Sequence, residues 1–299
     1  AGNYGDGGNV DLSASGDVTV AATAAVDVSG VLDGGRARIG GAFQGNGDDI
    51  DNSSSTTIEA GALILADSKQ VGNGGEVIVW SDGDTTFRGE ISARAGAVMG
   101  DGGFVEVSGK NALKFRGVVS TLATNGRTGT LLLDPTNVNI TAAGVTGTPD
   151  GGTITDEDVN FALTQNHLII HTGSADIEAG NITVESGVRI EWGTPNSTGG
   201  DSNSADYAQN FNDLTLLATG DIDINGHIIS HGAGNVNLFA GWDGATGFPG
   251  GNSAIAGTDL AGVLGPMDFS DLAQFGTPDG FSRVRINDGG NQQAVQVGS

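Results

Sequence analysis

Short runs of alternating apolar and polar residues recur along the chain, and the first run of each unit follows a Gly-Gly doublet. In the third unit the runs are Val77–Val79, Thr86–Arg88 and Glu90–Ala93. Alternation with a period of two and many β-branched residues predicts short strands that each bury one face. The doublets, each preceded by Asp or Asn, start at Gly7, Gly34, Gly74 and Gly102.

The spacing of the doublets indicates an internal repeat of about 28 residues. The three intervals are 27, 40 and 28 residues. A shift of 28 places Val77, Val79 and Phe87 on Val105, Val107 and Phe115. The long interval contains 12 extra residues, which we assign to a polar segment, 41–55. Because this insertion is rich in Gly, Ser and Asp, we expect it to be an exposed, mobile loop.

A repeat of this length with three short strands predicts a β-solenoid, in which each rung lies about 4.8 Å from the next. The doublet would mark the corner before the first strand, where Gly tolerates a positive φ. An antiparallel sandwich with Gly-rich hairpins remains the alternative. The expected inward ladders are Val10, Ala37, Val77, Val105 and Leu131, and beside it Leu12, Ile39, Val79, Val107 and Leu133.

The pattern divides the chain into regular rungs over 1–145 and a looser continuation over 146–299. In the second part, Thr155 followed by three acidic residues predicts the cap of a short helix over about 155–165, with Val159, Ala162 and Leu163 buried. Further strands follow. Two irregular loops, 193–213 and 240–281, interrupt them.

Charge narrows the range of partners. The chain has 12 Lys and Arg against 36 Asp and Glu, a net charge of −24. Such a balance disfavours nucleic acid, which is bound by basic residues. No apolar run approaches the length that spans a bilayer, about 20 residues, so we expect no direct membrane insertion. The absence of Cys fits an exported bacterial protein.

Aromatic residues beside the irregular loops are the candidate ligand contacts. Trp192, Tyr207 and Trp242 stand near Asp and Asn, and exposed rings of this kind stack on sugars. Trp80 is expected to face outward from its strand. Packing within the loops is the alternative for all of them.

Other chemistry-bearing residues predict no catalytic or metal site. The pairs His167/His171 and His227/His231 fall in β-branched runs, where strand geometry separates the two rings by about 13 Å, too far to share a metal. We expect no cofactor, and calcium in the acidic loops 46–51, 81–84 and 200–203 stays an alternative. The carboxylates Asp221 and Asp223 share the outward face of a strand, as solvated residues do.

The segment 102–140 contains the motifs GGxVxVSGK, LxFxG and GTLLLDP. This combination resembles large exoproteins of the filamentous haemagglutinin type, which Gram-negative bacteria secrete by two-partner systems, and the likeness extends over roughly residues 1–245. The resemblance implies a right-handed parallel β-helix at the cell surface and an outer-membrane transporter partner during export. The NPNL- and NPNG-type motifs of the family's secretion domain are not found, so the segment resembles shaft or tip.

We therefore expect an extracellular, non-enzymatic adhesin segment. Its rigid rod would project loops for cell–cell, matrix-polysaccharide or surface-protein attachment. A filament or spacer unit that assembles end to end is the second interpretation. A polysaccharide-degrading enzyme on a β-helix is the third.

Overall fold

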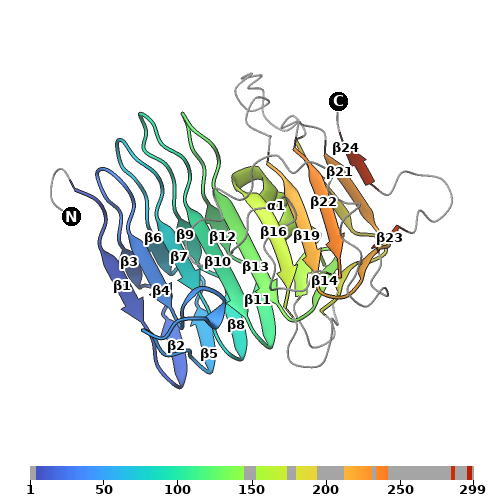
Figure 1. Cartoon of the computed structure of the whole chain (residues 1–299), viewed down its shortest axis with the longest axis horizontal. Coiled ribbons are helices and arrows are strands. Elements are labelled where there is room, and N and C mark those ends of the chain that lie inside the picture. Colours follow the sequence, from blue (N-terminus) through green and yellow to red (C-terminus); the bar gives the residue numbers. More distant parts are fainter. Residues whose placement is uncertain are drawn as a thin grey trace.

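The chain folds into a parallel β-helix, whose rungs succeed one another along the long axis of the molecule (Figure 1). The computed structural model describes residues 5–144, 153–173, 180–193, 212–230, 234–241, 284–286 and 295–297. All strand pairings among these residues are parallel, so the antiparallel sandwich is excluded.

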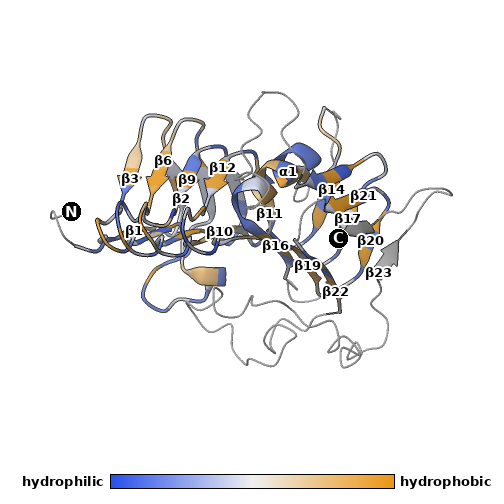
Figure 2. Cartoon of the chain, turned by 90° about the horizontal axis from the view of Figure 1, so that it is seen from above, coloured by the Kyte–Doolittle hydropathy of each residue, from blue (hydrophilic) through white to orange (hydrophobic). Residues whose placement is uncertain are grey.

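The first strands of the rungs form one long sheet, which runs along one side of the molecule (Figure 2). In spatial order its strands are β1 (Asn9–Leu12), β4 (Arg36–Ile39), β7 (Glu76–Val79), β10 (Phe104–Gly109), β13 (Thr130–Pro135), β16 (His167–Thr172), β19 (Leu214–Ala218) and β22 (Val236–Ala240).

The second strands form another sheet that continues through the same rungs. Its strands, in spatial order, are β2 (Asp17–Val20), β5 (Ser55–Ile58), β8 (Asp84–Phe87), β11 (Ala112–Phe115), β15 (Thr153–Thr155), β14 (Val138–Thr141), β17 (Ile182–Val184), β20 (Ile222–Ile224) and β23 (Val284–Ile286).

The third strands form two shorter sheets. One contains β3 (Ala25–Asp27), β6 (Leu63–Leu65), β9 (Glu90–Ser92) and β12 (Val118–Ser120). The other contains β18 (Arg189–Trp192), β21 (His227–Ser230) and β24 (Val295–Val297).

The core is the stack of inward side chains that the repeat predicts. Val105 pairs with Val77 on one side and with Leu131 on the other, and these residues are completely buried. Phe115 stacks on Phe87 with their ring centroids 5.4 Å apart. Both predicted ladders, from Val10 to Leu131 and from Leu12 to Leu133, are confirmed by the strand register.

A helix separates the two shorter sheets. It is α1 (Asp156–Gln165), which packs against β12 and β18 and buries Val159, Ala162 and Leu163, as predicted. Among the described residues, no helix combines the length and apolar character needed to cross a bilayer.

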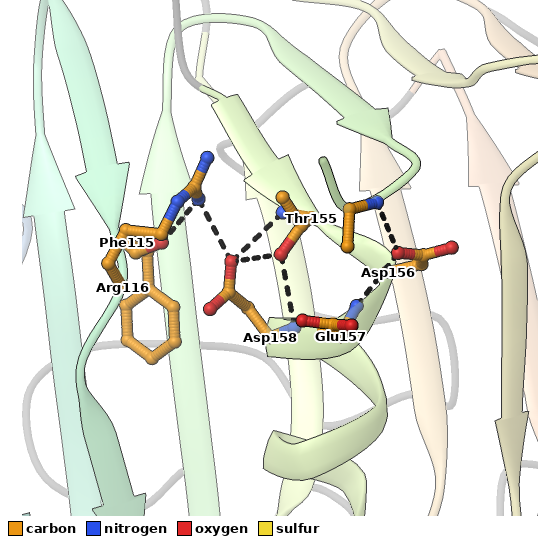
Figure 3. A network of polar contacts seen from close by, with 7 residues as sticks. Phe115, Arg116, Thr155, Asp156, Glu157 and Asp158 are labelled. Atoms are coloured by element: carbon orange, nitrogen blue, oxygen red, sulfur yellow. Dashed lines mark hydrogen bonds and ion pairs between the residues drawn. The ribbon is translucent and has the colours of Figure 1, made fainter. Parts of the chain in front are cut away.

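The start of α1 is fixed by a capping box (Figure 3). The Asp158 N–H donates to Thr155 Oγ1 at 3.3 Å, and the Thr155 N–H donates to Asp158 Oδ2 at 3.1 Å. Arg116, at the end of β11, donates to the same Asp158 oxygen at 2.9 Å. On the other side, Asp156 Oδ1 accepts the Ala143 N–H at 2.8 Å. The cap therefore ties the helix to the second sheet.

The insertion 41–55 is not the exposed loop that its composition predicts. It contains a short 3-10 helix, η1 (Phe43–Gly45), and lies on the outer face of the long sheet. The ring of Phe43 meets Phe104 edge-on, with centroids 5.9 Å apart. Arg38 binds Asp49 of the insertion and Asp11 of the first rung, at 2.8 and 2.7 Å.

The physical reason is that the outer face of this sheet is partly apolar. Ile78 and Trp80 point outward from β7, and both are buried. Gly41 and Gly45 lie so close to the Trp80 indole that a Cβ on either would approach it to 2.6 Å. The insertion thus covers apolar side chains that would otherwise face water.

Candidate functional site: a ridge along the corner loops

The candidate site lies on the four loops that connect a third strand to the first strand of the next rung. We call them the corner loops; they are the tall loops at the upper edge of Figure 1, coloured blue to green. Each is closed by one hydrogen bond between its two ends. The donors are Gly35, Gly75, Gly103 and Gly129, and their acceptors are the carbonyls of Val28, Ala66, Ala93 and Thr121, at 2.7–2.9 Å.

The Asp or Asn before the second, third and fourth doublets joins one corner loop to the next. Asp33 Oδ1 accepts the Asn73 N–H at 2.6 Å, and Asn73 Oδ1 accepts the Asp101 N–H at 2.8 Å. Asp101 Oδ1 accepts the Arg127 N–H at 2.8 Å. A ladder of side-chain acceptors therefore runs along the rod and holds the corner loops in register.

Seven of the eight doublet glycines are needed because the rungs approach closely, Gly8 being the exception, and the expected positive φ is wrong. None of the eight doublet glycines is among the residues with positive φ. A Cβ on Gly74 would lie 2.0 Å from Ala93 O, and one on Gly103 would lie 2.1 Å from Gly75 O. Any side chain would thus collide with the backbone of a neighbouring strand or rung.

Beyond these closures, the tips of the corner loops carry exposed apolar side chains. The exposed fractions are 42% for Leu32, 37% for Val71, 63% for Val98 and 57% for Met99. Val71 and Met99 form a parallel bridge, and the Gln70 and Val71 N–H groups both donate to Val31 O. The four residues therefore occupy successive layers. We call this row the ridge.

The ridge is a concentration of exposed apolar residues. Among the described residues, eight large apolar side chains are exposed, and four of them form the ridge. The other four are Leu12, Leu63, Val118 and Phe161. Exposed apolar side chains are ordinary when scattered, whereas a contiguous group marks an interaction surface.

Charged residues flank the ridge unevenly. The first corners contribute the exposed Asp6 and Asp33. The later corners contribute the exposed Arg94 and an ion pair between Arg127 and Asp101 at 2.9 Å. The backbone N–H of Arg127, and to a smaller extent its side chain, donate hydrogen bonds to Asp101 that lower the pKa of Asp101. The ridge is thus acidic at its first end, whereas its other end carries Arg94 and the Arg127–Asp101 ion pair. Between them, Lys69 of the second corner loop lies 4.0 Å from Asp27.

The structure corrects the expectation for Trp192. This residue is buried, with 1% of its surface exposed, and its Nε1–H donates to Asn212 O at 2.9 Å. Trp192 shares the inward side of β18 with Ile190, so its ring packs in the core and offers no face to a sugar. Tyr207 and Trp242 lie outside the described residues, as do most of the loops 193–213 and 240–281.

Beneath the insertion lies a second polar cluster. Glu106 is fully buried on the outer face of β10, and both its oxygens accept the Gln44 N–H at 3.2 Å. Burial raises the pKa of Glu106 well above its usual range, and the Asp134 carboxylate adds to the shift. Gln44 Nε2 donates to Asp134 at 3.4 Å, and His171 Nδ1 lies 3.0 Å from Asp134. These contacts fasten the insertion to the sheet.

The remaining chemistry-bearing residues make local contacts. His167 and His171 lie on one strand, as predicted, and each approaches an Asp on a neighbouring rung. In the acidic loops, Asp82 accepts from Trp80 Nε1 and Asp49 binds Arg38. Within the described ranges, no three His, Asp or Glu side chains gather as a metal site would require.

Comparison with protein-family models gives no match, and comparison with curated proteins gives none either. The family resemblance therefore rests only on the sequence motifs of residues 102–140.

Proposed function

We propose that this chain is a non-enzymatic, extracellular adhesin segment, a rigid β-helical rod that attaches through the ridge. Its motifs support membership of the filamentous haemagglutinin-type exoproteins, with a Gram-negative cell surface as location and an outer-membrane transporter as export partner. The attachment would serve cell–cell contact or binding to matrix polysaccharide or a surface protein.

The observation that carries this proposal is the ridge itself. Its side chains remain exposed although the loops beneath them are held by a corner hydrogen bond and by the acceptor ladder in every rung. Because these loops are already ordered, binding through them costs little conformational entropy. Loops on a rigid scaffold are also where binding residues are most often found.

The proposal is tested by bead attachment. Beads coated with the whole chain are washed over immobilised bacterial polysaccharide, cell-surface protein and intact Gram-negative cells. The test variant carries Val98→Glu and Met99→Glu, and the matched control carries Phe161→Glu on α1, where the side chain is 46% exposed.

We expect wild-type and control beads to be retained on at least one of these surfaces and the ridge variant to be washed off. Equal retention of ridge variant and wild type, or no retention of any bead, would contradict the proposal. All the substituted side chains are exposed, so we expect the variants to fold. Melting curves followed by circular dichroism, compared with that of the wild type, check this.

End-to-end assembly is the second candidate function, and the parallel stacking of the rungs favours it, because every rung pairs with the next through its strands. Edge strands present unpaired backbone groups that can take up another strand. Electron microscopy of the purified chain tests this: filaments one rod wide support it, and isolated short rods refute it.

A further inference from the structure

The apolar side chains of the ridge form a short row along the rod. Its apolar residues fall in three consecutive layers, with Leu32 in the first, Val71 in the second and Val98 and Met99 in the third. Two such rows can pair about a twofold axis through the middle layer, so that the first layer of each faces the third layer of the other. We propose that the partner of the ridge is the ridge of another molecule, with the two rods antiparallel and a twofold axis near Val71.

The charges select this orientation. In the antiparallel pair, the third layer of one molecule faces the first layer of the other, so Met99 meets Leu32. The fourth layer, with Arg127, then faces the layer that contains Asp6. The first layer, with Asp33, faces the third layer, which contains Arg94 as well as Asp101, and Asp101 is ion-paired with Arg127. The net charges of the facing layers are therefore of opposite sign. In a parallel pair every residue would face its own copy, and Asp6, Asp33 and Arg127 would each meet a like charge. Unlike charges across an interface favour the correct pairing, and like charges oppose the wrong one.

The twofold arrangement also explains why a short ridge suffices. An isologous interface uses each contact twice, so Leu32–Met99 occurs at both ends around a central Val71 pair. The loops change little on binding, because the corner hydrogen bonds fix them beforehand.

The inference rests on the proposed adhesive function and specifies its partner. Rods that project from two facing cells approach each other in opposite directions. Antiparallel pairing of their ridges would therefore join cell to cell, and this chain would mediate attachment between cells of one kind.

Self-association of the whole purified chain is measured by sedimentation velocity over a range of concentrations. We expect a monomer–dimer equilibrium whose dissociation constant rises at least about tenfold in Val98→Glu/Met99→Glu, since such a loss corresponds to one well-packed contact region. Arg127→Glu should weaken the dimer in the same direction, and more at low salt than at high salt. Phe161→Glu should leave it unchanged.

The orientation is tested with single cysteines, which report cleanly because the natural chain has no Cys. Leu32→Cys in a tagged chain is mixed with Met99→Cys in an untagged chain and mildly oxidised. We expect disulfide dimers between the two species, and dimers of Val71→Cys with itself. Leu32→Cys linked chiefly to itself would overturn the antiparallel arrangement.

Self-pairing of the ridge and adhesion through the ridge can be refuted separately. If wild-type chain stays monomeric at every concentration while ridge-dependent retention on polysaccharide or protein persists, self-pairing is refuted and the adhesive function stands. If the chain dimerises with Val98→Glu/Met99→Glu as readily as wild type, the ridge is not the interface and self-pairing is refuted. If ridge-dependent retention is also absent, the adhesive function is refuted as well.

Discussion

The close approach of rungs at the Gly doublets predicts a large cost for Gly103→Ala. The added Cβ would lie 2.1 Å from Gly75 O and 2.8 Å from Gly74 C, both backbone atoms of the preceding rung. Neither atom can swing away as the end of a side chain can. The two rungs must therefore move apart at this corner.

The required movement sets the magnitude. Relaxing a 2.1 Å contact to just over 3 Å moves the backbones by about 1 Å, and the Phe104 N–H···O Gly75 hydrogen bond, now 3.0 Å, would lengthen to about 4 Å. That bond is lost, and the neighbouring Gly103 N–H···O Ala93 bond at 2.8 Å is strained. If the lost bond and the strained bond each cost about 1–2 kcal/mol, Gly103→Ala should cost about 2–4 kcal/mol.

Gly8→Ala is the matched control, because Gly8 is also the second glycine of a doublet. It belongs to the first rung, and a Cβ there would meet nothing within 4 Å. Equilibrium unfolding in guanidinium should therefore show Gly8→Ala within about 1 kcal/mol of wild type, in the stabilising direction. Equal losses in both variants would refute close approach as the cause.

Three further predictions concern the interior and the insertion. Glu106 has a raised pKa in the folded state, so its stabilising contribution is present below its ordinary pKa and is lost as pH rises through the folded value. Glu106→Gln should therefore stabilise the chain increasingly as the pH rises above the ordinary pKa of a glutamate. A gain in stability that does not grow with pH would contradict this. Replacing residues 42–51 by a short Gly-Ser linker should expose Trp80, increase the quenching of tryptophan fluorescence by acrylamide and lower the unfolding midpoint. Unchanged quenching would contradict the conclusion that the insertion covers Trp80. Val107→Asp should remove hydrogen-exchange protection from β7, β10 and β13, because burial of a lone carboxylate costs several kcal/mol. β19 should keep its protection, because stacked rungs couple mainly to their neighbours. Loss of protection in all four strands would contradict this.

Local pattern was sufficient to predict the rungs because each strand repeats its neighbour at a fixed spacing. The register of Val77 on Val105 and the cap at Thr155 both follow from residues close in sequence. The reason for the doublets could not be predicted, because the atom that a Cβ on Gly103 would strike belongs to another rung. The same holds for the insertion, since Gln44 finds its acceptor 62 residues away at Glu106.

Two features of the site leave a signal in the sequence. Trp192 has the same parity as Val188 and Ile190, and this alternation alone predicts an inward side chain. The ridge also left a signal. Leu32, Val71 and Met99 each stand two or three residues before a doublet, in loops where polar residues would be expected.

The central claim is that identical rods attach to one another through the ridge, and aggregation of coated beads tests it most directly. Beads that carry the whole chain should clump, and soluble wild-type chain should disperse them by competition. Beads with Val98→Glu/Met99→Glu should stay dispersed, while beads with Phe161→Glu should clump as wild type does. Clumping of the ridge-variant beads to the wild-type extent would contradict the account.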